Sequence, residues 1–151
     1  MLLSKSAEYG LRATLYLTAL EPEGYVAIRE ISKEVDISFH FLTKILQKLT
    51  EAGLIRSFRG PKGGVALARS PDRITLYDIV VAIDGPELFT ECVLGLPGCG
   101  EHRPCPLHDA WRVERGRLQA LLTGTTLATL AARIREEGLR LAPGAPVPPE
   151  A

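Results

Sequence analysis

The sequence predicts a mainly α-helical fold with one small β-hairpin. Apolar residues recur at the three-to-four-residue spacing of helices through most of the 151 residues. Two short runs in which apolar residues alternate, at 54–59 and 65–69, flank the glycine-rich stretch GPKGG, a pattern typical of a hairpin. The order helix, helix, tight turn, amphipathic helix, hairpin is that of a winged helix-turn-helix, which we assign to residues 1–85.

Each predicted helix of this domain has a recognisable start or end. The first runs to about residue 20, with Ser4 or Ser6 as its N-cap, and the second covers residues 28–35. The third follows Ser38, another good N-cap, and Gly53 ends it. A fourth begins after Thr75 with an acidic residue three positions on, close to a capping box.

The rest of the chain is expected to form three further segments. Residues 86–104 form a loop that is rich in Cys, Gly and Pro. Residues 105–138 hold a long helix, roughly 105–122, and a last short helix after the breaker TGTT. The Pro-rich tail 139–151 is expected to be disordered.

Composition narrows the class of protein. No run of 18 or more apolar residues occurs, and the N-terminus lacks the apolar core and cleavage site of a signal peptide, so we expect a cytoplasmic protein that does not enter a membrane. Residues 38–73 carry a net charge of +5, whereas residues 74–151 carry −3. Such asymmetry indicates a local polyanionic partner. No nucleophile–base arrangement is visible, so we do not expect an enzyme.

The third helix and the hairpin carry the residue types of a DNA-reading surface. Opposite the apolar stripe of this helix, polar residues recur at i, i+3, i+4 and i+7. Lysines suit phosphates, and His, Thr and Gln can meet base edges. Any surface helix has a polar face, but the basic hairpin directly after it favours contact with double-stranded DNA. The candidate DNA-binding residues are Ser38, His40, Thr43, Lys44, Gln47, Lys48, Arg56, Arg59 and Lys62.

All three cysteines lie in one loop, with the spacing Cys92-x6-Cys99-x5-Cys105-x2-His108. An odd number of thiols argues against a plain disulfide framework. Thiolates bind soft metals and iron–sulfur clusters, and imidazole can replace a thiolate on one iron. Structural zinc, a thiol/disulfide switch and an iron–sulfur electron-transfer protein remain alternatives, although the CxxC pairs of common zinc and redox sites are missing.

These motifs together resemble the IscR/NsrR family of iron–sulfur winged-helix transcription regulators, over about residues 1–137. The carrying stretches are LLSKSAEYGLRA, ISFHFLTKILQKL, RSFRGPKGG, TLYDIVVAID and the loop that ends in CPLHDAW. The resemblance implies a homodimeric regulator, a repressor by preference, on a palindromic operator. Its dimerisation helix would follow the cysteine loop. The candidate interface residues are Leu107, Trp111, Leu118 and Leu122.

The resemblance also implies a ligand set. Cys92, Cys99 and Cys105 match the three cysteine ligands of the family. Members similar to IscR use a histidine three residues after the last cysteine, which matches His108, and hold a 2Fe–2S cluster. Members similar to NsrR lack this histidine, and some recruit a carboxylate from the partner subunit onto a 4Fe–4S cluster; Glu8 stands at that position. We favour His108 and 2Fe–2S. A change in the shape of the loop would re-aim the dimerisation helix and with it the two DNA-reading helices.

Overall fold

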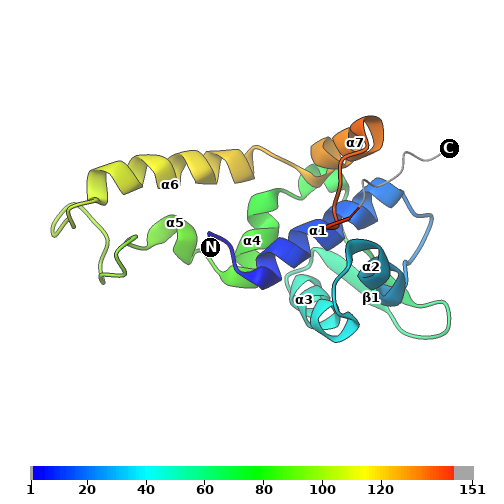
Figure 1. The fold of residues 1–151 in the computed structure, drawn as a ribbon. Helices are drawn as coiled ribbons and strands as arrows, with labels where there is room; N and C mark the ends of the chain where they lie inside the picture. Colours follow the sequence, from blue (N-terminus) through cyan, green and yellow to red (C-terminus); the bar gives the residue numbers. More distant parts are fainter. Residues whose placement is uncertain (1, 145–151) are drawn as a thin grey trace.

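The computed structural model describes residues 2–144 and confirms a mainly helical fold with one antiparallel hairpin (Figure 1). The elements are α1 (Lys5–Leu20), α2 (Ile28–Val35), α3 (Phe39–Glu51), β1 (Ile55–Phe58), β2 (Gly64–Leu67), the 3-10 turn η1 (Pro71–Arg73), α4 (Leu76–Asp84), α5 (Glu87–Thr90), α6 (His108–Thr123) and α7 (Leu127–Glu137).

Helix α1 lies at the centre of the body and packs against α2, α3, α4 and α7. Its residues Ala13, Tyr16 and Leu17 are buried, as the helical spacing predicts. Gly10 allows the closest approach, because a Cβ atom there would clash with Ile83 of α4 and crowd Ile45 of α3. The main core forms around α1 and includes Leu42, Ile45, Leu46 and Leu49, which are the predicted apolar stripe of α3.

The predicted helix boundaries have the expected chemistry. The Ser4 side chain accepts a hydrogen bond from the N–H of Ala7, and Ser38 caps α3. Thr75 and Asp78 form a complete capping box at the start of α4. Gly53 follows α3 in a left-handed conformation, with φ of 76°.

The hairpin is anchored to the body through the buried residues Ile55 and Val65 and through a backbone pairing with the segment before α2. Strand β1 pairs with β2 from Ile55 opposite Leu67 to Phe58 opposite Gly64. Val65 also exchanges two backbone hydrogen bonds of 2.9 Å with Val26, which precedes α2. At Gly64 a Cβ atom would run into the Val26 carbonyl, so this close pairing requires glycine. The wing is thereby fixed relative to the helix-turn-helix.

Two boundaries of the second half differ from the sequence prediction. The loop contains a short helix, α5, that the sequence does not signal clearly. Helix α6 starts at His108 and not at Cys105. The reason is that Cys105 precedes Pro106, and a residue before proline is pushed out of the α conformation. Cys105 therefore lies in the loop, and its carbonyl accepts the N–H of His108 at 3.0 Å.

The start of the predicted tail lies against the body. Leu141 packs on the main core, and its carbonyl accepts a hydrogen bond of 2.6 Å from Nε of Arg12 in α1. The prediction of disorder for the rest of the tail falls largely on residues 145–151, which lie outside the described residues.

Candidate functional site

The cysteine loop and the start of α6 bring three sulfurs and an imidazole nitrogen together as two pairs. The Sγ atoms of Cys92 and Cys105 are 3.5 Å apart. The Sγ atom of Cys99 is 3.6 Å from Nδ1 of His108. All three thiols are free, and Cys92 is buried. Positive φ angles of 72° at Gly95 and Gly98 let the backbone turn sharply between the first two cysteines.

His108 is the donor with the most informative surroundings. It is 5 % exposed, although it is the first residue of α6. Its Nε2 atom is buried without a hydrogen-bond partner among the described residues. An orphaned nitrogen of this kind is costly in an apolar setting and calls for an explanation, of which an absent ligand is one. His102, by contrast, is exposed in the loop.

Two residues of α6 fasten the loop to the helix: Trp111, which the sequence suggested only as an interface residue, and Arg115, which the sequence pattern did not single out. Trp111 donates its indole N–H to the carbonyl of Glu91 at 2.9 Å. Arg115 donates to the same carbonyl at 3.2 Å and to Sγ of Cys99 at 3.4 Å. Trp111 and Arg115 lie about one and two helical turns after His108, on the same face of α6. That periodicity is a signal that sequence reasoning could have used.

The thiols differ in acidity because their neighbours differ. Backbone N–H groups of Leu96 and Leu94 hold the pKa of the Cys92 thiol below its ordinary value, and the contact with Cys105 acts in the same direction. Burial, followed by the contact with Cys92, raises the pKa of the Cys105 thiol. Cys92 is therefore the more acidic thiol of the pair.

The donor set suits a soft metal or an iron–sulfur cluster, since it consists of three sulfurs and an imidazole with a free buried nitrogen. The two pairs are separate, however: within residues 2–144 no group of three or more His, Cys, Asp or Glu side chains is arranged to hold a metal ion. Within residues 2–144, the Glu8 carboxylate forms no hydrogen bond with a thiol of its own chain. It forms an ion pair of 3.1 Å with Lys5 instead.

The polar face of α3 is built as predicted, but its residues are not equally free to meet DNA. His40 and Lys44 are exposed. Thr43 donates its hydroxyl to the Phe39 carbonyl at 2.7 Å, and Ser38 is engaged as the N-cap. Lys48 donates to the carbonyl of Ile83 at 3.4 Å, so it contacts the end of α4.

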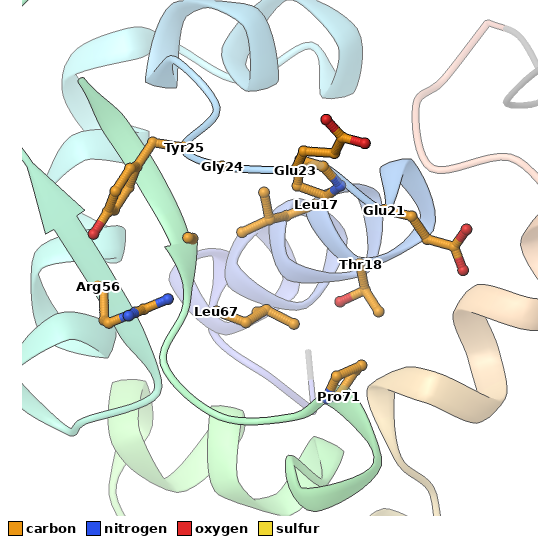
Figure 2. Close-up of a pocket in the computed structure, with 11 residues that line it drawn as sticks. Leu17, Thr18, Glu21, Glu23, Gly24, Tyr25, Arg56, Leu67 and Pro71 are labelled. Atoms are coloured by element: carbon orange, nitrogen blue, oxygen red, sulfur yellow. The ribbon is translucent and has the colours of Figure 1, made fainter. Parts of the chain in front are cut away.

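The wing divides its basic residues between two surfaces. Arg59 lines a groove of about 790 Å³ between α3 and the hairpin. Arg56 instead lines a separate pocket of about 320 Å³ on the other side, together with Leu17, Glu21 and Tyr25 (Figure 2). Lys62 is exposed at the tip. The predicted DNA contacts of the wing are therefore not one continuous patch.

The cysteine loop is joined to the DNA-reading half through the end of α4. Asp84, the last residue of α4, accepts hydrogen bonds from the backbone N–H and the hydroxyl of Ser4 at the start of α1. Lys48 of α3 holds the neighbouring Ile83 carbonyl. Gly85 then turns the chain towards α5 with φ of 82°. The end of α4 that leads into the loop is therefore in contact with both α1 and α3.

The candidate interface residues of α6 fall into different environments. Leu122 is buried in a small cluster with Val80 and Phe89 of the same chain. Leu107 is 46 % exposed, and Leu121, which the sequence analysis did not select, is 61 % exposed. Trp111 and Leu118 are half-buried. In Figure 1 α6 (yellow) extends away from the helical body.

No helix in the part of the chain described by the structure is both long enough and apolar enough to cross a membrane.

Comparisons with known proteins agree with this architecture. Residues 3–133 match the family model of Rrf2, described as an iron-dependent transcriptional regulator. The chain belongs to the Rrf2 family. It is 34 % identical over 130 residues to the HTH-type transcriptional regulator IscR of Aliivibrio salmonicida, covering 86 % of this chain and 77 % of that protein. This Rrf2-family chain is therefore a transcriptional regulator and not an enzyme.

Two solved structures are similar to the whole fold. CymR, the global cysteine regulator of B. subtilis, superimposes with a TM-score of 0.74 at 29 % identity, over 86 % of this chain and 95 % of that one. IscR of T. potens has a TM-score of 0.72 at 25 % identity, over 91 % of each chain. DNA binding follows from membership of the Rrf2 family.

Proposed function

We propose that this Rrf2-family regulator is a homodimeric repressor whose affinity for a palindromic operator depends on an iron–sulfur cluster. The observation that carries the proposal is the pairing of Cys92 with Cys105 and of Cys99 with His108 at the start of α6. Membership of a family described as iron-dependent and the similarity to IscR proteins support the same chemistry. The cytoplasm is the compartment in which such thiols remain reduced.

Each donor has a proposed role. Cys92, Cys99 and Cys105 would supply thiolates, and His108 would supply the fourth ligand, with 2Fe–2S favoured. A bound iron–sulfur cluster supplies one-electron redox chemistry and sensitivity to nitric oxide and to the supply of iron and sulfide. Arg115 would donate a hydrogen bond to Cys99, and Trp111 would hold the loop against α6. A 4Fe–4S cluster with Glu8 of the partner subunit as a ligand is the alternative.

On the DNA side, α3 would enter the major groove and the wing would contact the backbone or minor groove. Two copies joined through α6 would present two α3 helices to two half-sites, about one helical turn or a multiple of it apart. Exposed Leu107, together with half-buried Trp111 and Leu118, would contribute to that interface. A difference of about 5- to 150-fold in operator affinity between the two states would be sufficient for a switch.

The test combines spectroscopy with DNA binding. Protein purified without oxygen is expected to show visible absorption bands and equal amounts of iron and sulfide, and its operator affinity should change when the iron is chelated. His108→Ala should lose the bands, whereas His102→Ala, which removes an exposed histidine of the same loop, should keep them. Colourless protein with bound zinc would contradict the cluster and leave the DNA-binding function intact. Loss of iron in Glu8→Ala but not in His108→Ala would transfer the fourth ligand to Glu8.

A thiol switch is the second candidate function, because the two sulfurs of Cys92 and Cys105 are already 3.5 Å apart. Oxidation by hydrogen peroxide would remove two electrons and two protons from the pair, form one S–S bond and release two waters. Similarity to CymR, named as a cysteine regulator, favours this candidate. Mass spectrometry of the metal-free, peroxide-treated protein should find the bridge between these two cysteines. Bridges distributed equally over all three pairs would argue against it.

A further inference from the structure

The groove between α3 and the wing is lined by a basic residue that does not belong to the polar face of α3. Arg29, in the first turn of α2, lines this groove together with Arg59 of the wing. Its guanidinium carbon lies 4.3 Å above the ring centroid of Phe39, the first residue of α3. Phe58, which also lines the groove, stacks on Tyr25 of the separate Arg56 pocket, with ring centroids 5.4 Å apart.

The charge of the groove points to an anion. Among the described residues that line it there are two arginines and no Asp or Glu. Within residues 2–144, neither Arg29 nor Arg59 has a carboxylate partner at ion-pair distance. The other polar side chains of the lining, such as Thr43, Gln47 and Ser57, are neutral hydrogen-bonding groups. The groove is therefore a cationic channel with uncharged polar walls.

The geometry of duplex DNA says which anion fits. One phosphate strand separates the major groove from the neighbouring minor groove. If α3 lies in the major groove and the wing reaches the minor groove, that strand must pass over the space between them. In this protein the space is the groove lined by Arg29, Phe39 and Arg59.

We propose that Arg29, held by stacking on Phe39, is a phosphate clamp for the DNA strand that runs between α3 and the wing. The inference rests on the proposed DNA-binding mode. The ring contacts the guanidinium from one side, and the N–H groups of Arg29 have no hydrogen-bond partner among the described residues, so they are free for two phosphate oxygens. Phe39 acts as a positioning residue, because the stack restricts the arginine before DNA arrives and lowers the entropy lost on binding. Lysine has no planar fork and would replace this arginine poorly.

The test needs a duplex of known register. The probe is a duplex selected by the wild-type protein from a random-sequence pool, with single phosphates replaced in turn by uncharged methylphosphonates. Arg29→Gln is expected to weaken binding about 10-fold, Phe39→Leu about 2- to 5-fold, and Arg29→Lys by an intermediate factor. The matched control is Arg73→Gln, which removes an exposed arginine outside the groove. Circular dichroism checks that each variant is folded.

The decisive result is that the loss of affinity caused by removing Arg29 and the loss caused by neutralising one particular phosphate do not add. A methylphosphonate at one position between the two grooves should weaken the wild type but have no further effect on Arg29→Gln. Equal losses in Arg29→Gln and Arg73→Gln, or losses that add at every phosphate, would overturn the clamp. If Arg29→Gln is unfolded, the same comparison is made with Phe39→Leu and Arg29→Lys. Losses of affinity that add at every phosphate in these variants would also refute the clamp. Failure of the wild-type protein to select any duplex would instead refute the DNA-binding function itself.

Discussion

Lys44 and Lys48 lie four residues apart on α3 and are both exposed, and the sequence assigns both to phosphates, yet the structure gives a polar contact to only one of them. Lys44 is exposed, and within the described residues no carboxylate lies at ion-pair distance from it. Lys48 donates to the Ile83 carbonyl at the C-terminal end of α4, where the helix dipole favours a cation. We expect only Lys44 to bind a phosphate.

The magnitude follows from counterion release. Each phosphate contact contributes about 0.9 to the slope of log affinity against log salt concentration, so a dimer that loses two contacts loses about 1.8. Lys44→Gln should reduce the slope by this amount. Lys48→Gln should leave the slope unchanged and instead lower the free energy of unfolding by about 0.3–1 kcal/mol, the typical value of a cation at a helix C-terminus.

Fluorescence anisotropy of a labelled duplex over a series of salt concentrations measures the slope, and urea denaturation measures the stability. Wild-type protein and both variants are compared at the same duplex and temperature. A reduced slope for Lys48→Gln equal to that of Lys44→Gln would refute the assignment. It would show that Lys48 leaves Ile83 when DNA binds.

Three further predictions concern α6 and the core. Leu122→Ala, in a buried position, should cost about 2–3 kcal/mol of unfolding free energy, whereas Leu121→Ala, on the exposed side, should mainly weaken dimerisation in sedimentation experiments; the reverse order would contradict the placement of α6. Arg115→Met should speed the loss of iron to a chelator, whereas Arg112→Met, which removes only an exposed ion pair of 3.7 Å, should not. Burial, and then the charges of two nearby glutamates, raise the pKa of Tyr16 to about 12. The neutral phenol should therefore contribute about 2 kcal/mol to the free energy of unfolding below its ordinary pKa of about 10, and this contribution should disappear as the pH rises through about 12. Urea denaturation of Tyr16→Phe over the same pH range should lack this loss.

The first half of the fold could be predicted because its signals are local. Helix α3 has its N-cap at Ser38, its apolar stripe and its terminating Gly53 within one short stretch of sequence. The capping box at Thr75 is equally self-contained. The predicted start of α6 at Cys105 is wrong although Pro106 carries the information, because proline is common at helix starts but also pushes the preceding residue out of the α conformation.

The candidate site was predictable in its residue types but not in its contacts. The spacing of the cysteines places them in one loop, but it does not say that Cys92 faces Cys105 or that Cys99 faces His108. These pairings depend on how the loop folds back on α6, which is a tertiary contact set by Trp111 and Arg115. Likewise, the polar pattern of α3 does not show that Lys48 donates a hydrogen bond to the Ile83 carbonyl of α4.

The position of Lys48 bears on how the two halves of the molecule communicate. Its partner, the Ile83 carbonyl, is two residues before Gly85, where the chain turns towards the cysteine loop. Asp84, between them, holds the start of α1 through Ser4. A change in the loop that altered the end of α4 would therefore act on the recognition helix and on α1 together. An effector shifts an equilibrium between two conformations only if it binds them with different affinity. The contacts at the end of α4 are a place where the conformations with and without a bound cluster can differ. If this node carries the coupling, Lys48→Gln should reduce the ratio of operator affinities with and without bound iron while leaving the salt dependence of binding unchanged.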